Sequence, residues 1–208
     1  MENVLDIYQE DESEEFPLIC MDETSKQQIE ETRIPINGNN GVKYYDYEYK
    51  RNGVSSIFIF YAPLINWRVI KVTDRRTAKD WAIAMKELAD IYFPNAKKIK
   101  VVLDNLNTHK LSSFYKVFEP KEAKRLADKF ELHYTPKHAS WLNMAEIEFS
   151  ILSRQCLNRR IATQEILKSE VNKWQDNRNN SKHKINWRFT TSNARIKLKK
   201  LYPSLKES

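Results

Sequence analysis

The order of the short apolar runs is the feature that most constrains the fold of this 208-residue chain. A compact run at residues 16–21 ends at an aspartate, and runs rich in β-branched and aromatic residues follow at 44–49, 56–61 and 67–72. The short connections between the last three predict antiparallel pairing. The first run, apolar throughout, would lie beside them as a central strand covered on both faces. The beginning of the chain is therefore predicted to form one side of a mixed sheet.

A helix and a parallel strand are predicted next. Thr77 with Asp80 three residues later has the form of a helix N-cap, and apolar residues recur at helical spacing until Pro94. Residues 99–103 return as a short strand, which a right-handed crossover would place beside the first one.

The remaining elements complete an α/β pattern. Helical stretches at 111–118 and 120–129 precede a short strand at 131–134, and a long helix is predicted from about 141 to 158. We expect a mixed five-stranded sheet, with an antiparallel three-stranded meander plus parallel strands, flanked by helices. Three segments are expected: an acidic leader at 1–16, a main domain at 17–160, and a basic helical extension at 161–208 packed on the same domain.

The charge distribution favours a polyanionic partner. Lys and Arg total 35 against 28 Asp and Glu, a formal net charge of +7. Residues 150–208 hold 14 basic against 4 acidic residues, a local net of +10. No run approaches the roughly 18 apolar residues of a membrane span, and Cys20 and Cys156 belong to no Cys-x-x-Cys or Cys/His cluster. We therefore expect an intracellular protein without a membrane segment, disulfide framework or structural zinc.

Three acidic residues occupy positions that this fold can use for chemistry. Asp22 follows the first apolar run, Asp104 follows the strand at 99–103, and Glu146 lies early in the long helix. Adjacent strand ends bring carboxylates together, and Mg²⁺ and Mn²⁺ prefer oxygen ligands. Two such ions can serve phosphodiester chemistry. Taken singly, however, acids after strands also cap helices or occupy turns, and the residues alone leave both interpretations open.

Two glutamates compete for the third position. Glu146 and Glu148 are two residues apart, about 200° around a helix, so only one can face the aspartates. Projection of the helix places Glu148 between two apolar stripes, whereas Glu146 shares its side with Ser150 and Ser153. The periodicity therefore favours Glu146.

The residues around the three acids resemble the catalytic domain of the DDE transposases, in the bacterial insertion-sequence branch related to the mariner transposons. Met-Asp-Glu-Thr-Ser-Lys at 21–26, Val-Val-Leu-Asp-Asn at 101–105 with Thr-His at 108–109, and Tyr-Thr-Pro at 134–136 leading into Ser-Trp-Leu-Asn-Met-Ala-Glu at 140–146 carry the resemblance. It spans about 17–203.

This resemblance implies a ribonuclease H-like fold with a DDE triad at Asp22, Asp104 and Glu146 that binds two Mg²⁺ or Mn²⁺ ions. In the family, the third acid follows Leu-Asn after two intervening residues, which also selects Glu146. The implied activity is metal-dependent strand cleavage at transposon ends and strand transfer into target DNA at a TA dinucleotide, without a covalent enzyme intermediate.

Several residues are candidates for contact with DNA. Basic residues after Glu146 could track phosphates, Trp141 could stack on an unpaired base, and His109 could contact a phosphate or shuttle a proton. The alternatives are solvated helix faces for the basic residues, packing for Trp141, and a surface or capping role for His109. The full set is His109, Lys137, Trp141, Arg154, Arg159, Arg160, Lys173 and Arg178.

The expected partners also follow from the resemblance. They are double-stranded DNA, comprising inverted-repeat ends and target, and a second copy of the chain in the active complex, in a bacterial cytoplasm at the nucleoid. Family members carry helix-turn-helix modules before the catalytic domain. Because the first catalytic strand begins by residue 18, such a half would come from a separate or frameshifted reading frame, or would have been lost in a decayed copy.

Two other functions stay open from the sequence. The chain could be an inactive or regulatory truncated transposase that binds DNA or a full-length transposase. It could also be a stand-alone structure-specific nuclease.

Overall fold

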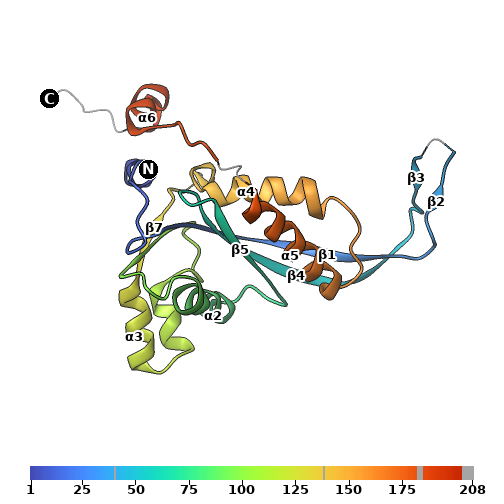
Figure 1. The fold of residues 1–208 in the computed structure, drawn as a ribbon, viewed down its shortest axis with the longest axis horizontal. Coiled ribbons are helices and arrows are strands. Elements are labelled where there is room, and N and C mark those ends of the chain that lie inside the picture. Colours follow the sequence, from blue (N-terminus) through green and yellow to red (C-terminus); the bar gives the residue numbers. More distant parts are fainter. Residues whose placement is uncertain (40, 138, 182–184, 203–208) are drawn as a thin grey trace.

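The computed structural model describes residues 1–39, 41–137, 139–181 and 185–202 and is built around a five-stranded sheet (Figure 1). The strand order is β5-β4-β1-β6-β7. Antiparallel ladders join β1 (Leu18–Glu31) to β4 (Tyr49–Ala62) and β4 to β5 (Trp67–Thr73). Parallel ladders join β1 to β6 (Ile99–Leu103) and β6 to β7 (Phe130–Tyr134). The mixed sheet predicted from the sequence is confirmed.

The meander is built differently from the prediction. β1 does not end at Met21 but continues to Glu31. The three strands of the antiparallel meander are therefore β1, β4 and β5. The second half of β1 is polar and is held by its ladder with β4, which left no apolar run to reveal it. The strand predicted at 44–49 is wrong: β3 (Lys43–Tyr44) pairs with β2 (Ile36–Asn37), in a separate two-stranded ribbon at the far end of the β1–β4 hairpin (Figure 1).

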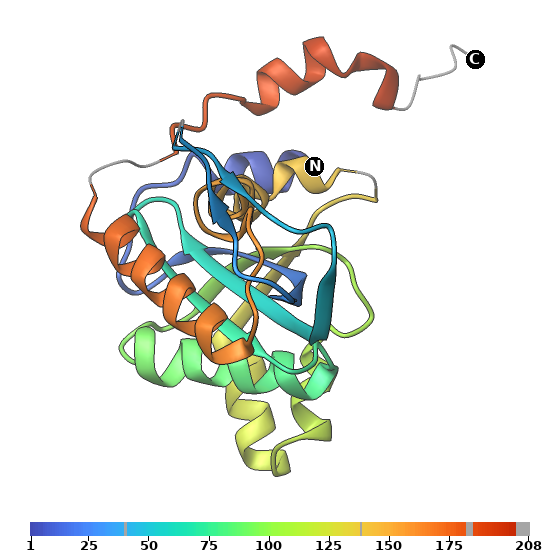
Figure 2. The ribbon, with the colours of Figure 1, turned by 90° about the vertical axis from the view of Figure 1, so that its right-hand side faces the viewer.

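Helices cover both faces of the sheet (Figures 1 and 2). On one face, α2 (Ala78–Glu87) begins at the predicted capping box of Thr77 and Asp80 and continues as a π-helical turn, Leu88–Tyr92. A 3-10 turn (Leu111–Lys116) and α3 (Pro120–Lys129) lie on the same face. The other face carries α4 (Met144–Leu152), its π-helical extension Ser153–Leu157, and α5 (Gln164–Asn180).

Two cores result from the alternation of side chains along the strands. Leu18 and Cys20 of β1 point to the core under α4 and α5, whereas Ile19 and Met21 point to the core under α2 and α3. Cys20 and Cys156 are buried free thiols.

The ends of the described chain meet each other. The acidic leader contains a helix, α1 (Glu2–Ile7), whose Val4, Leu5 and Ile7 are buried in the same core as α4 and α5. Arg195 of α6 (Thr191–Lys197) donates two hydrogen bonds of 2.8 Å to Glu2. Short 3-10 turns at Ser140–Leu142 and Lys199–Leu201 complete the elements. None of the helices in the described ranges is long and apolar enough to cross a membrane. The three-segment division of the chain stays a prediction.

Candidate functional site

Asp22 lies on β1, and Asp104 directly follows the neighbouring parallel strand β6. The register of β1 and β6 pairs Cys20 with Val102, and two residues further along both strands it leads to Asp22 and Asp104. Neighbouring strands are about 4.8 Å apart where they pair, and the last pair of this ladder lies two residues before each aspartate. Asp104 directly follows β6, but Asp22 lies within β1, because β4 still pairs with β1 there through Ile59. The expectation that both aspartates end strands is correct only for Asp104.

Glu146 reaches the same place from the first turn of α4. The N-cap of this helix is Asn143, whose Oδ1 accepts from the Ala145 backbone N–H at 3.1 Å. The Asn143 Nδ2 also donates to the Met21 carbonyl at 2.8 Å, which ties the start of α4 to β1 one residue before Asp22. In the sequence Asn143 stands out only as part of a motif, because its tie to β1 depends on tertiary structure.

A cleft contains two of the three acids. It is lined by Asp22, Glu146, Ser150 and Ser153 together with the polar part of β1 from Glu23 to Lys26. Asp104 lines an adjoining hollow with Asn105, Pro136 and Lys137. A separate cavity of about 290 Å³ lies near the start of β1, against Pro17 and Phe93, and none of the three acids lines it.

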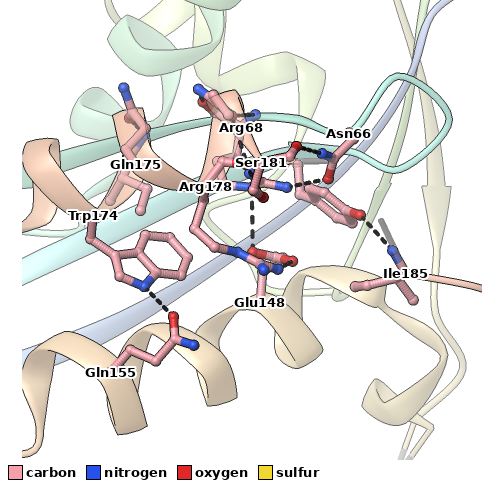
Figure 3. Close-up of polar contacts among 12 residues, drawn as sticks. Asn66, Arg68, Glu148, Gln155, Trp174, Gln175, Arg178, Ser181 and Ile185 are labelled. Carbon is pink, nitrogen blue, oxygen red and sulfur yellow. Dashed lines mark hydrogen bonds and ion pairs between the residues drawn. The ribbon is translucent and has the colours of Figure 1, made fainter. Parts of the chain in front are cut away.

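The competing Glu148 is placed elsewhere. Its side chain is fully buried and pairs with two arginines, Arg178 and Arg68, beneath α4 and α5 (Figure 3). Of the two glutamates, only Glu146 lines the cleft with Asp22.

The acids interact electrostatically. Burial, and after it the neighbouring charges of Asp104 and Glu146, raise the pKa of Asp22 to about 7, although a hydrogen bond from the Glu23 backbone N–H acts against the shift. Because carboxylates that repel one another resist ionisation, a bound cation would relieve the repulsion. The site therefore gathers negative charge at the place where β1, β6 and α4 meet.

The donor set fits a hard divalent cation in its chemistry, since all three side chains offer carboxylate oxygens. Within the described part of the chain, however, no three or more His, Cys, Asp or Glu side chains are already arranged so that they could hold a metal ion. Asp22, Asp104 and Glu146 are the residues that would hold one.

His109 has a different environment from the one expected. It is fully buried, its Nδ1 lies 2.8 Å from Asp104 Oδ1, and its Nε2 lies 3.3 Å from Glu23 Oε2. Burial opposes protonation, but the bonds to Asp104 and Glu23 prevail and raise the pKa of His109 to about 9, so the charged ring donates to both carboxylates. The ring also stacks on Trp81, with centroids 5.8 Å apart. The structure does not support a phosphate contact by this buried side chain; His109 holds Asp104 in place.

Three of the remaining DNA-binding candidates are exposed. Lys137 lies beside Asp104 in the adjoining hollow. Trp141 is 42% exposed and meets Phe189 edge-on, with ring centroids 5.6 Å apart. Arg154 is exposed on the π-helical extension of α4.

The other four basic candidates pair with acidic residues of this chain. Arg159 and Lys173 both pair with Glu170, and Arg160 pairs with Glu31 at 2.6 Å. Arg178 is only 15% exposed and pairs with Glu148 in the interior, so a phosphate contact by Arg178 is not supported. The sequence could not reveal this, because the pairing depends on how α5 packs against α4.

A sheet with an antiparallel meander on one side of β1 and parallel strands on the other, with carboxylates on β1, after β6 and on α4, defines a ribonuclease H-like nuclease fold. The model of the family described as DDE superfamily endonuclease matches residues 17–168. The chain therefore belongs to the family of DDE superfamily endonucleases.

Solved structures with a similar fold include chains from complexes of the Mos1 transposase. The Mos1 strand transfer complex matches with a TM-score of 0.57 and 11% identity, over 84% of this chain and 52% of that one. The Mos1 mariner paired end complex with Mn matches with a TM-score of 0.55 and 12% identity, over 85% and 54%. The corresponding complex with Mg matches with a TM-score of 0.55 and 10% identity, over 84% of this chain and 53% of that one. This chain thus spans about half the length of those chains. No curated protein matches it by sequence.

Proposed function

We propose that this chain is the catalytic part of a DNA transposase, which cleaves strands at transposon ends and transfers them to target DNA. The observation that carries the proposal is the position of Asp22, Asp104 and Glu146 around one point of a DDE-family fold. The similar structures are described as strand transfer and paired end complexes, some with Mn or Mg, which supports the same reaction and the same metals here.

The three carboxylates would hold two Mg²⁺ or Mn²⁺ ions. When bound, such ions activate the attacking oxygen and stabilise the leaving one. The side chains of the protein serve to hold and orient, so no covalent intermediate with the protein is needed. His109 fixes Asp104, and Asn143 fixes the start of α4 next to Asp22.

The contact with DNA is proposed to involve the exposed Lys137, Trp141 and Arg154, which flank the acids or follow Glu146 along its helix. A TA target, a homodimeric active complex and a helix-turn-helix half that reads the transposon ends belong to the same proposal. One similar structure is a Mos1 transposase paired-end complex with a left transposon end, which supports DNA ends as substrates.

The first experiment is nicking of a supercoiled plasmid over a titration of Mg²⁺ or Mn²⁺. Wild type should nick only with metal, and Asp104→Asn and Glu146→Gln should lose the activity while remaining folded by circular dichroism. Glu122→Gln is the matched control, because Glu122 is a partly exposed carboxylate on α3 that pairs with two cations, Lys86 and Arg125. Nicking by Asp104→Asn would refute the assignment.

A second experiment separates a transposase from the alternatives. Linear DNA carrying inverted-repeat ends should be cut at the ends in preference to a branched substrate without repeats. Preference for the branched substrate indicates a stand-alone nuclease instead. DNA binding with no cutting under any metal condition indicates an inactive or regulatory copy.

A further inference from the structure

Glu148 is the centre of a buried ion network beneath the helix that carries Glu146. Its Oε1 accepts from Arg178 Nη2 at 2.7 Å, and its Oε2 lies 3.3 Å from Arg68 Nε (Figure 3). The contact with Arg68 is an ion pair without hydrogen-bond alignment. The side chains of Glu148 and Arg68 are both 0% exposed, and that of Arg178 is 15% exposed.

The network joins three elements. Glu148 belongs to α4, Arg68 to β5 and Arg178 to α5. Arg68 is itself held on several sides: its Nη2 donates to Asn66 Oδ1 at 2.7 Å, its Nη1 donates to Asn179 Oδ1 at 3.2 Å, and its guanidinium lies 5.2 Å from the centre of the Tyr61 ring. The partner of Glu148 is therefore a fixed point of the sheet and not a movable surface side chain.

This attachment controls the rotation of α4 about its axis. Glu146 and Glu148 point about 200° apart, so a helix that buries Glu148 turns Glu146 to the opposite side, where the cleft with Asp22 lies. Glu146 also lies between two attachments of α4, the bond from Asn143 to Met21 on one side and the Glu148 network on the other. Rotation about the helix axis and movement along it are both restrained.

We propose that Glu148, together with Arg68 and Arg178, is a positioning group that orients α4 so that Glu146 can complete the metal site. The inference rests on the proposed function, because it assigns a purpose to the geometry of that site. Groups that orient metal ligands from behind commonly change metal affinity by about 10- to 100-fold when they are mutated.

The charges indicate which substitutions are informative. One carboxylate lies between two guanidiniums, so Glu148→Gln leaves two cations facing each other in the interior and releases the helix. Arg178→Lys keeps the charge but loses the planar fork, so we expect it to be the milder variant. Glu122→Gln again provides the control, since it removes a carboxylate of α3 that pairs with Lys86 of α2 and Arg125 of α3, on the opposite face of the sheet.

The test is Mn²⁺ binding by isothermal titration calorimetry with the DNA-free full chain, at a temperature where circular dichroism shows every variant folded. We expect Glu148→Gln to weaken Mn²⁺ binding by about 10-fold or more, Arg178→Lys to weaken it by a smaller factor, and Glu122→Gln to match wild type. In the metal-free protein, amide hydrogen exchange of α4 should be faster in Glu148→Gln than in wild type. A role in stability alone would lower the melting temperature without these changes in folded protein.

Three results would overturn the inference. Wild-type affinity for Mn²⁺ in folded Glu148→Gln refutes the positioning role and leaves the proposed function intact. If Glu148→Gln does not fold, unchanged affinity and unchanged exchange in Arg178→Lys refute the positioning role in the same way. Absence of Mn²⁺ binding in wild type overturns the proposed function and the inference together.

Discussion

The raised pKa of Asp22 makes a quantitative prediction about stability. The ordinary pKa of the group is 3.8 and the folded protein raises it to about 7, chiefly through burial. At 1.36 kcal/mol for each unit of pKa, this shift corresponds to about 4 kcal/mol in the free energy of unfolding. Asp22 retains some contact with water, so we take this as the upper value and expect about 2 to 4 kcal/mol.

The direction follows from proton binding. Between pH 3.8 and about 7 the folded protein holds a proton on Asp22 that the unfolded chain has lost, so the free energy of unfolding decreases as pH rises through this range. Asp22→Asn is neutral at every pH and removes the effect. The stability of Asp22→Asn relative to wild type should therefore increase from about pH 4 to pH 8.

The assay is urea denaturation followed by circular dichroism, with EDTA present, at pH values from 4 to 8. Asp128→Asn is the control, because Asp128 is an exposed carboxylate paired with Lys124, and its difference from wild type should stay within about 0.5 kcal/mol. A difference between Asp22→Asn and wild type that is constant or falls with pH would refute the reasoning. If the acids hold a cation, Mn²⁺ at pH 8 should stabilise wild type more than Asp22→Asn.

Three further substitutions test the supports of the site and of the fold. His109→Gln removes the charged link between Asp104 and Glu23, so we expect plasmid nicking to fall about 10-fold or more at saturating metal, measured as an initial rate; an unchanged rate would exclude the positioning role. Asn143→Ala removes both the cap of α4 and the bond to Met21, and urea denaturation should show a loss of about 1 to 2 kcal/mol. Thr77→Ala should lose about 1 kcal/mol in the same assay without any change in Mn²⁺ affinity, and an altered affinity would show that α2 influences the site.

Local signals in the sequence were sufficient for much of the fold. The capping box at Thr77 depends on neighbours within four residues, and the helix begins at the predicted position. The apolar run at 99–103 forms β6, since a buried parallel strand needs little except its own hydrophobicity. The polar half of β1 has no such run and is held by its partner strand, so it could not be predicted from its own residues.

In the site, too, some residues were predictable from local sequence and others depend on contacts between distant parts of the chain. The positions of Asp104 after a strand and of Glu146 on an amphipathic helix were predictable from the chain. The buried His109 packs on Trp81, and the largely buried Arg178 pairs with Glu148. In both pairs the two residues are distant in sequence. Charged and titratable side chains that enter the interior through tertiary contacts carry no periodic signal, which is why both were expected at the surface.

The different origins of the three acid positions affect how this site can vary. Asp22 and Asp104 each lie two residues beyond the last main-chain pair of β1 and β6, and a slip of one residue in this pairing would turn the side chains to the opposite face. Glu146 is carried by a helix that the side chains of Asn143 and Glu148 attach to the rest of the fold. Side-chain substitutions can therefore change the position of the third acid in small steps, while the positions of the first two acids depend on the pairing of the same two strands.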